Sequence, residues 1–150
     1  MSTKRKFVDN TAIPVNTLLE EQSSRALRSW RSTRADNFHA PALNLMRAAV
    51  ANVAMLGEPR WRDAAAGDPA AAVAIALAMG PENSQALKFD MCMTALVVCA
   101  CTGDAASCLV IAWMLKRMPN SKRREKRLAA SWSVRAMRPL LARVGDGSLT

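Results

Sequence analysis

The chain has 150 residues, with 21 Lys and Arg against 12 Asp and Glu, and a net charge of +9. Hydrophobic residues make up 51% of it, which excludes a disordered or low-complexity chain and suits one globular domain. The length leaves no room for a two-domain enzyme.

The positive charge is concentrated at the two ends of the sequence. Residues 1–40 hold seven basic residues and four acids, residues 41–118 hold six of each, and residues 119–150 hold eight basic residues and two acids. A neutral middle between basic ends favours an anionic partner. The alternative is that the basic ends only keep the chain soluble.

Residues 1–16 are expected to form a basic flexible arm, ahead of a single helical domain over residues 17–150. Lys4, Arg5 and Lys6 are followed by no apolar stretch, so this arm is not a secretory signal peptide. A capping-box pattern from Thr17 to Glu20 predicts that the first helix begins there and runs to about residue 33.

Helix starts and stops recur along the neutral core 41–118, where Asp or Ser opens a segment and Gly or Pro ends it. No segment shows sustained alternation of apolar and polar residues. We therefore predict an all-α fold, a compact bundle of about six or seven helices built from αα-hairpins. The expected helices of the core cover residues 42–56, 69–79, 84–102 and 104–118.

Two strings that begin with Gly-Asp, at Gly67 and at Gly103, align at an offset of 36 residues. That period suits paired-helix solenoids, so a short helical-repeat array is the alternative to an ordinary bundle. The stretch 89–120 loosely resembles one helix pair of the tetratricopeptide or pentatricopeptide type. It lacks the aromatic and proline positions that define the tetratricopeptide family. The residues that carry the resemblance are Leu96, Gly103, Ala105, Ala106 and Met118.

The most apolar window runs from Met91 to Leu115 and is long enough to span a bilayer. Gly103-Asp104 interrupts its middle, where an Asp costs about 2.5–3.5 kcal/mol on insertion scales. We expect two buried helices here, and membrane association through 91–115 is the alternative.

The four cysteines have the spacing C-x6-C-x-C-x6-C, which matches no zinc knuckle. They lie in the most apolar part of the chain, where free Cys acts as a small hydrophobe. The sequence therefore predicts free thiols, no metal, and an intracellular, reducing setting. We expect a cytoplasmic protein, with the nucleus or a nucleoprotein particle as alternatives, and not a secreted one.

The final expected helix, residues 121–144, carries the strongest local signal. Arg124, Arg127, Arg135 and Arg138 are predicted to form one stripe, and Leu128, Trp132, Ala136 and Leu140 form another. An apolar stripe can pack on the core while guanidinium groups on the other stripe bind phosphates. A solvated charged face is the alternative.

Trp30 and Trp132 lie among arginines and could stack on unpaired bases, although packing is the favoured role of each tryptophan, and Trp113 is expected in the core. Together these patterns predict a nucleic-acid interface. Its candidate residues are Lys4, Arg5, Lys6, Arg25, Arg28, Arg31, Lys122, Arg123, Arg124, Arg127, Arg135, Arg138 and Trp132.

Catalysis has little basis in this sequence. The only histidine, His39, has no recognisable nucleophilic partner, and phosphate-binding glycine loops are absent. We expect no enzyme activity, cofactor or metal. The sequence favours a nucleic-acid-binding assembly protein, of a coat or nucleocapsid type or an accessory binder of RNA or DNA. It would contact phosphates through its basic ends and form homo-oligomers through its neutral core. The alternative is a helical adaptor or effector that binds an acidic protein.

Overall fold

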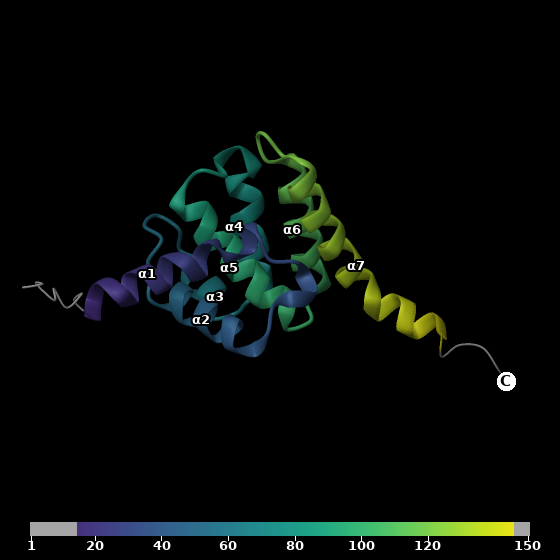
Figure 1. Cartoon of the computed structure of the whole chain (residues 1–150), viewed down its shortest axis with the longest axis horizontal. Helices are drawn as coiled ribbons and strands as arrows, with labels where there is room; N and C mark the ends of the chain where they lie inside the picture. Colours follow the sequence, from purple (N-terminus) through teal and green to yellow (C-terminus); the bar gives the residue numbers. More distant parts are fainter. Residues whose placement is uncertain (1–14, 146–150) are drawn as a thin grey trace, which may run out of the picture.

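The computed structural model describes residues 15–145, and within them the chain is all helical, with no strand (Figure 1). The seven α-helices are α1 (Val15–Arg28), α2 (Ala40–Ala51), α3 (Trp61–Ala65), α4 (Pro69–Met79), α5 (Leu87–Cys101), α6 (Ala105–Arg117) and α7 (Arg123–Gly145). Three single-turn 3₁₀ helices are η1 (Ser29–Arg31), η2 (Ala35–Asn37) and η3 (Pro81–Asn83). The predicted fold class, an all-α bundle of six or seven helices, is confirmed.

The two Gly-Asp turns share one geometry. Gly67 and Gly103 have φ of 101° and 110°, a left-handed conformation that suits glycine. Asp68 and Asp104 then cap the next helix by accepting backbone N–H groups, at 3.1 Å and 2.7 Å. The helices before the turns have 5 and 15 residues, so the 36-residue correspondence covers the turn and the helix after it rather than a whole helix pair.

Some expected helix ends are displaced by side-chain contacts. Ser84 does not open α5, because it is buried and its carbonyl accepts a hydrogen bond from Arg31. Ser121 does not open α7, because its hydroxyl donates to the Leu115 carbonyl at 2.8 Å. Pro139 lies inside α7, which continues to Gly145.

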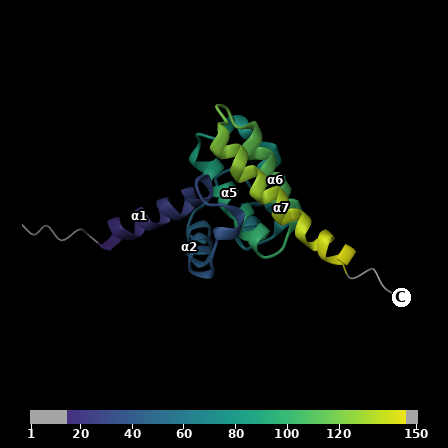
Figure 2. The same ribbon diagram turned by 45° about the vertical axis from the view of Figure 1, so that its right-hand side comes forward.

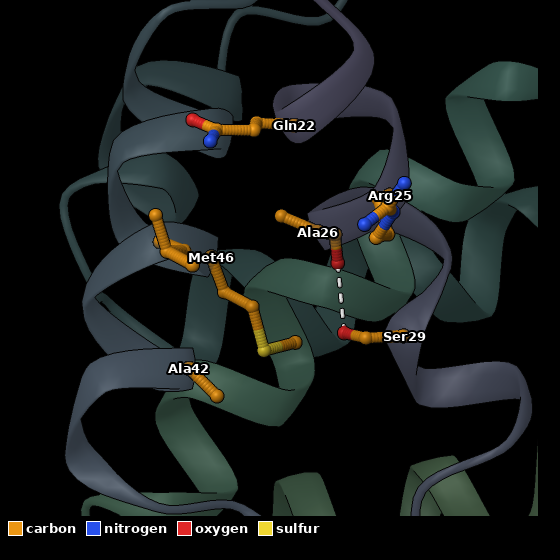
Figure 3. Close-up of a pocket in the computed structure, with 7 residues that line it drawn as sticks. Gln22, Arg25, Ala26, Ser29, Ala42 and Met46 are labelled. Atoms are coloured by element: carbon orange, nitrogen blue, oxygen red, sulfur yellow. Dashed lines mark hydrogen bonds between the residues drawn. The ribbon is translucent and has the colours of Figure 1, made fainter. Parts of the chain in front are cut away.

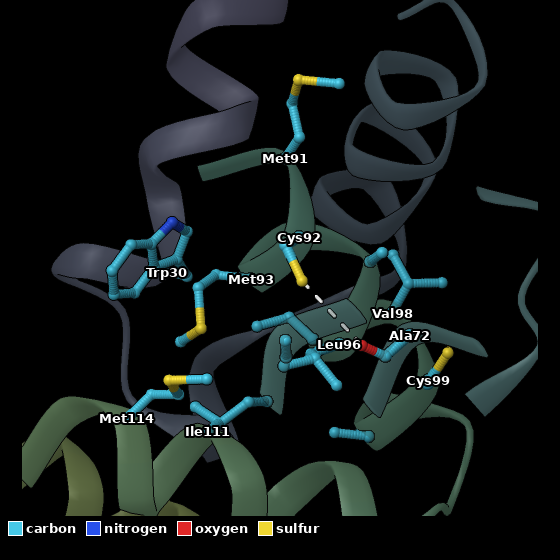
Figure 4. Close-up of a cluster of buried hydrophobic side chains, with 14 of the residues drawn as sticks. Trp30, Ala72, Met91, Cys92, Met93, Leu96, Val98, Cys99, Ile111 and Met114 are labelled. Carbon is cyan, nitrogen blue, oxygen red and sulfur yellow. Dashed lines mark hydrogen bonds between the residues drawn. The ribbon is translucent and has the colours of Figure 1, made fainter. Parts of the chain in front are cut away.

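α5 is the centre of the bundle, since every residue from Phe89 to Ala100 is buried. α1, α2, α4 and α6 pack around it, and Figure 4 shows the Met, Leu, Ile and Cys side chains that fill the interior. A helix surrounded on all sides needs no polar stripe, which explains its continuous apolar sequence.

In the part of the chain that the structure describes, no helix is both long and apolar enough to cross a membrane. The window 91–115 is divided between α5 and α6, as Gly103-Asp104 predicts.

One buried carboxylate joins α5 to the end of α1. Asp90 is 4% exposed and accepts hydrogen bonds from Trp30 Nε1 at 3.1 Å and from Arg31 Nε at 2.8 Å. The Arg31 guanidinium also covers the Trp30 ring, 4.4 Å from its centroid. A buried charge with these donors is satisfied, and removing any of them would leave it costly to keep buried.

Two helices extend beyond the body of the bundle. α7 packs along α6 as far as Ala136, after which its side chains up to Val144 are exposed. The first turns of α1 are also exposed, and Figure 2 shows α1 and α7 extending from opposite sides of the bundle. Leu18, Leu19, Leu140 and Leu141 are all more than two-fifths exposed on these extensions.

Candidate nucleic-acid interface

The basic residues predicted near the N-terminus have different outcomes. Lys4, Arg5 and Lys6 lie outside the described residues. Arg31 is bound to Asp90 and is 27% exposed, so the expectation that it faces a phosphate is wrong. Arg28 is 69% exposed, with its Nε 3.8 Å from Asp90, and Arg25 is exposed beside α2. The buried Asp90 carboxylate thus pairs with part of the positive charge of this N-terminal segment.

The second half of the predicted arginine stripe on α7 makes contacts within the chain. Arg135 donates from Nη1 to the Ala35 carbonyl at 2.8 Å and from Nη2 to the Cys101 carbonyl at 3.4 Å. Arg138 Nη1 lies 3.0 Å from Asp36 Oδ1. Arg135 thus connects α7 to η2 and to the end of α5, whereas Arg138 connects α7 to η2 by one ion pair and stays 57% exposed.

The exposure of the tryptophans differs from the sequence prediction. Trp30 and Trp132 are 0% exposed, so neither can stack on a base, and that expectation for Trp132 is wrong. Trp113, expected in the core, is 37% exposed on α6. The Arg117 guanidinium lies 5.4 Å from the centroid of its ring. Trp113 and Arg117 therefore present an exposed indole and a guanidinium plane next to each other, two groups on which unpaired bases can stack.

The free basic side chains gather at the end of the α6–α7 hairpin. Lys116 and Arg117 end α6, Lys122 ends the turn 118–122, and the basic residues from Arg123 to Arg127 begin α7, at the top of Figure 1. We call this set the hairpin-tip cluster, and all its members are exposed. Its residues are Lys116, Arg117, Lys122, Arg123, Arg124, Lys126 and Arg127.

Backbone and side-chain hydrogen bonds fix the shape of this turn. Asn120 has a φ of 62°, a left-handed conformation that Asn tolerates better than most residues. The only acid between residues 116 and 127, Glu125, accepts the Lys122 N–H at 2.9 Å and so closes the first turn of α7. Hydrogen bonds from the backbone N–H groups of Glu125 and Lys122 lower the pKa of this carboxyl. Six positive charges therefore remain in excess on twelve residues.

The basic residues at the start of α7 do not stabilise this helix. The N-terminus of a helix carries a partial positive charge, so each cation there is unfavourable by about 0.3–1 kcal/mol. Lys and Arg at the end of α6 are favourable, whereas those at the start of α7 repel both the helix dipole and one another.

Sequence reasoning missed Lys116 and Arg117 because it assigned them to the neutral middle of the chain. The signal was available: a five-residue connection between two antiparallel helices brings the end of the first beside the start of the second. Charge counted over the hairpin, rather than over segments of the sequence, would have found the whole cluster.

The described residues give no sign of a catalytic or metal centre. None of their His, Cys, Asp and Glu side chains come together in threes in a way that could hold a metal. His39 is exposed, and its Nδ1 accepts the Ala42 N–H at 3.4 Å as the cap of α2. Burial raises the pKa of Cys92 to about 12 and those of Cys99 and Cys108 to about 11, which keeps these thiols protonated and unreactive.

The arrangement of the hairpin tip suits binding of anions by guanidinium and ammonium groups, with an indole beside them. Comparisons of this chain with protein-family models, with curated proteins and with solved structures find no match.

Proposed function

We propose that this chain is a non-enzymatic nucleic-acid-binding assembly protein that contacts phosphates with its hairpin-tip cluster. The observation that carries the proposal is the set of seven exposed basic side chains at the end of one helical hairpin, one of which, Arg117, lies against the exposed Trp113 ring. Lys4, Arg5 and Lys6 belong to the proposal as a second basic segment, although they lie outside the described residues.

The charge at the tip has few acceptors within the chain. Arg124 Nε lies 3.5 Å from Glu125, and no other ion pair involves the cluster within residues 15–145. Each phosphate that replaces solvent counterions on such groups contributes a salt-dependent term to affinity. Arginine adds two parallel hydrogen bonds to one phosphate, which lysine cannot.

Trp113 favours single strands over duplexes as the ligand. An unpaired base can stack on the indole and on the Arg117 guanidinium above it, whereas a paired base is already stacked in the duplex. Stacking is tolerant of sequence because every base has an aromatic face, so the proposed binding is general rather than sequence-specific. RNA and single-stranded DNA are both suitable ligands.

The test is a salt titration of binding to a labelled single strand and a labelled duplex, followed by fluorescence anisotropy. The tip variant changes four exposed residues of the cluster to Gln: Lys122, Arg123, Lys126 and Arg127. The control variant removes the same charge elsewhere, by changing Arg34, Arg47, Arg62 and Lys88 to Gln. All eight side chains are exposed, so both variants should fold.

We expect the tip variant to lose most of its affinity for the single strand. Its slope of log affinity against log salt should flatten by roughly 3, since each lost contact accounts for about 0.7. The control should stay near the wild type. Equal losses of affinity in both variants would mean that net charge, and not the position of the hairpin tip, determines binding. No binding by the folded wild type at low salt would overturn the proposal and leave an acidic protein as the partner to seek.

A further inference from the structure

One oxygen of the buried Asp90 carboxylate has no hydrogen-bond donor. Oδ1 accepts from Trp30 Nε1 and from Arg31 Nε, whereas Oδ2 accepts no hydrogen bond within residues 15–145. Arg28 Nε lies 3.8 Å from Oδ2, which is too far for a hydrogen bond, and the Asp90 side chain is only 6% exposed. A buried carboxylate oxygen without a donor is costly, so a donor from outside the chain would stabilise it.

Asp90 lines a cavity of about 290 Å³ that opens between the end of α1 and the start of α5. The other residues that line it are Arg28, Arg31 and Gln85, so every side chain around it is charged or polar. The volume is near the lower limit for small-ligand sites, about 300 Å³. We call this cavity the Asp90 pocket.

The cavity between α1 and α2 differs in kind (Figure 3). Ala26, Ala42 and Met46 line it, and the hydroxyl of Ser29 already donates to the Ala26 carbonyl at 2.8 Å. Its one charged residue, Arg25, is exposed to solvent. That cavity therefore presents no buried polar group in need of a partner, whereas the Asp90 pocket does.

The charges of the Asp90 pocket select the kind of ligand. Two guanidinium groups and one carboxylate leave one positive charge in excess, which favours an anion. Arg28 is 69% exposed and donates no hydrogen bond within the described residues, so its planar fork is free to bind a phosphate. An ammonium group on Oδ2 would be a third cation around one carboxylate, so the donor that suits Oδ2 is a neutral hydroxyl.

The pocket lies at the same end of the α5–α6 hairpin as the hairpin tip. α5 and α6 are joined by the turn 102–104 and run antiparallel, so the start of α5, with Asp90, lies toward the end of α6, with Lys116 and Arg117. η3, which ends two residues before Gln85, also contacts α6. A strand bound at the tip can therefore continue toward this pocket.

We propose that the Asp90 pocket binds one ribonucleotide of the strand held at the hairpin tip, with the phosphate on Arg28 and the ribose 2′-hydroxyl donating to Asp90 Oδ2. In RNA the 2′-hydroxyl stands next to the 3′-phosphate, which matches an acceptor beside a free guanidinium. Since DNA lacks this hydroxyl, the pocket selects RNA over DNA. The inference deepens the proposed function and rests on it for the strand, although the pocket can be tested without one.

The first arm of the experiment follows the indole N–H of Trp30 by NMR, because this group donates to the same carboxylate. The ligands are uridine 3′-monophosphate and its 2′-deoxy and 2′-fluoro forms, at about 1–10 mM. All three carry the same base and phosphate, and only the first has a 2′-hydroxyl. The buried indoles of Trp61 and Trp132 are internal references. We expect the ribonucleotide to move the Trp30 resonance much more than either analogue does.

Arg28→Gln removes the proposed phosphate contact and should abolish this shift. Arg25→Gln is the matched control, since it removes one exposed arginine of the same helix that does not line the pocket. Asp90 stays unchanged, because its removal would destabilise the fold. Circular dichroism checks that both variants are folded.

The second arm measures binding of an RNA strand, a 2′-fluoro strand and a DNA strand of one sequence by fluorescence anisotropy. The wild type and Arg25→Gln should bind RNA about tenfold more tightly than the other two strands, the gain from one hydrogen bond to a charged acceptor. Arg28→Gln should bind all three alike. The tip variant should lose affinity for every strand and still show the Trp30 shift with the ribonucleotide.

Three results would overturn the inference. Equal Trp30 shifts with the three nucleotides, or none, would mean that water alone occupies Oδ2. A shift that survives Arg28→Gln would remove the phosphate contact. A ribonucleotide shift in the wild type with equal affinities for the three strands would leave a free ribonucleotide, and not a strand, as the ligand. Failure of the proposed function looks different: no strand binds the wild type, whereas the Trp30 shift persists.

Discussion

Arg31 of η1 and the arginines of the hairpin tip are the same residue type and differ in what they contact. Arg31 donates to a buried carboxylate, whereas Arg123 and Arg127 are exposed and have no ion-pair partner in the described part of the chain. The same residue type holds the fold together in one region and offers charge to solvent in the other. Whether a basic side chain is exposed and unpaired, rather than how many basic residues a segment contains, indicates where an anion can bind.

The largest change in stability is expected when the buried Asp90 carboxylate is removed. Asp90→Ala should lower the free energy of unfolding by about 3–5 kcal/mol, because it leaves Arg31 and Trp30 Nε1 without their acceptor. Urea denaturation of the variant measures this. Asp63→Ala, at an exposed acid on α3, is the control and should change stability little. Comparable losses in the two variants would contradict the anchoring role of Asp90.

The exposed side of the comparison is tested by the two tryptophans. Trp113→Leu should weaken single-strand binding by about 1–3 kcal/mol, the contribution of one stacked base, and leave duplex binding nearly unchanged. Trp132→Leu, at a buried ring, should instead lower stability without changing the affinity of the folded protein. Anisotropy and urea denaturation on both variants separate the roles, and a reversed pattern would show that Trp113 is only a packing residue.

Arg135 belongs with Arg31 rather than with the tip. Arg135→Met should cost about 1–3 kcal/mol of stability, because the Ala35 carbonyl loses its donor at 2.8 Å. The salt slope of strand binding should not change, since this guanidinium makes no phosphate contact in the proposal. A flatter salt slope of strand binding with unchanged stability would contradict this and indicate that Arg135 contacts phosphate.

The smallest effect at neutral pH concerns the thiols. Burial raises the pKa of Cys92 to about 12, so the folded chain keeps a proton that the unfolded chain releases near pH 8.5. Stability should therefore be independent of these thiols below about pH 8 and fall as pH rises from there toward 12. Denaturation of Cys92→Ala against pH should show a shallower alkaline decline; an unchanged decline would assign it to other groups.

The helices were predictable because Gly, Pro and Asp act locally. The capping of α4 by Asp68 and of α6 by Asp104 needs only neighbouring residues, so both starts could be inferred from the sequence. Helix ends that depend on distant contacts were not predictable. Ser84 and Ser121 look like helix caps, but their hydrogen bonds go to or come from other helices.

The sequence indicates that the start of α7 is basic, but it does not indicate which arginines and tryptophans of the α6–α7 hairpin are buried or paired. The basic character of α7 is visible in the sequence, which singles out Lys122, Arg123, Arg124 and Arg127 but not Lys126, and all five are exposed. Periodicity could not show that Arg135 and Arg138 face η2, because that depends on where the chain before α2 lies. Nor could it show that Trp113 is exposed while Trp132 is buried, since both lie on amphipathic helices in one hairpin.

The most direct test of the central claim is lysine footprinting of the folded chain with and without a single-stranded oligonucleotide. Acetylation of each lysine is read by mass spectrometry, and Lys88, exposed on α5, serves as an internal control. We predict protection of Lys116, Lys122 and Lys126 with no change at Lys88. Equal modification of all four lysines with and without the oligonucleotide, under conditions where it is bound, would contradict the hairpin tip as the binding surface.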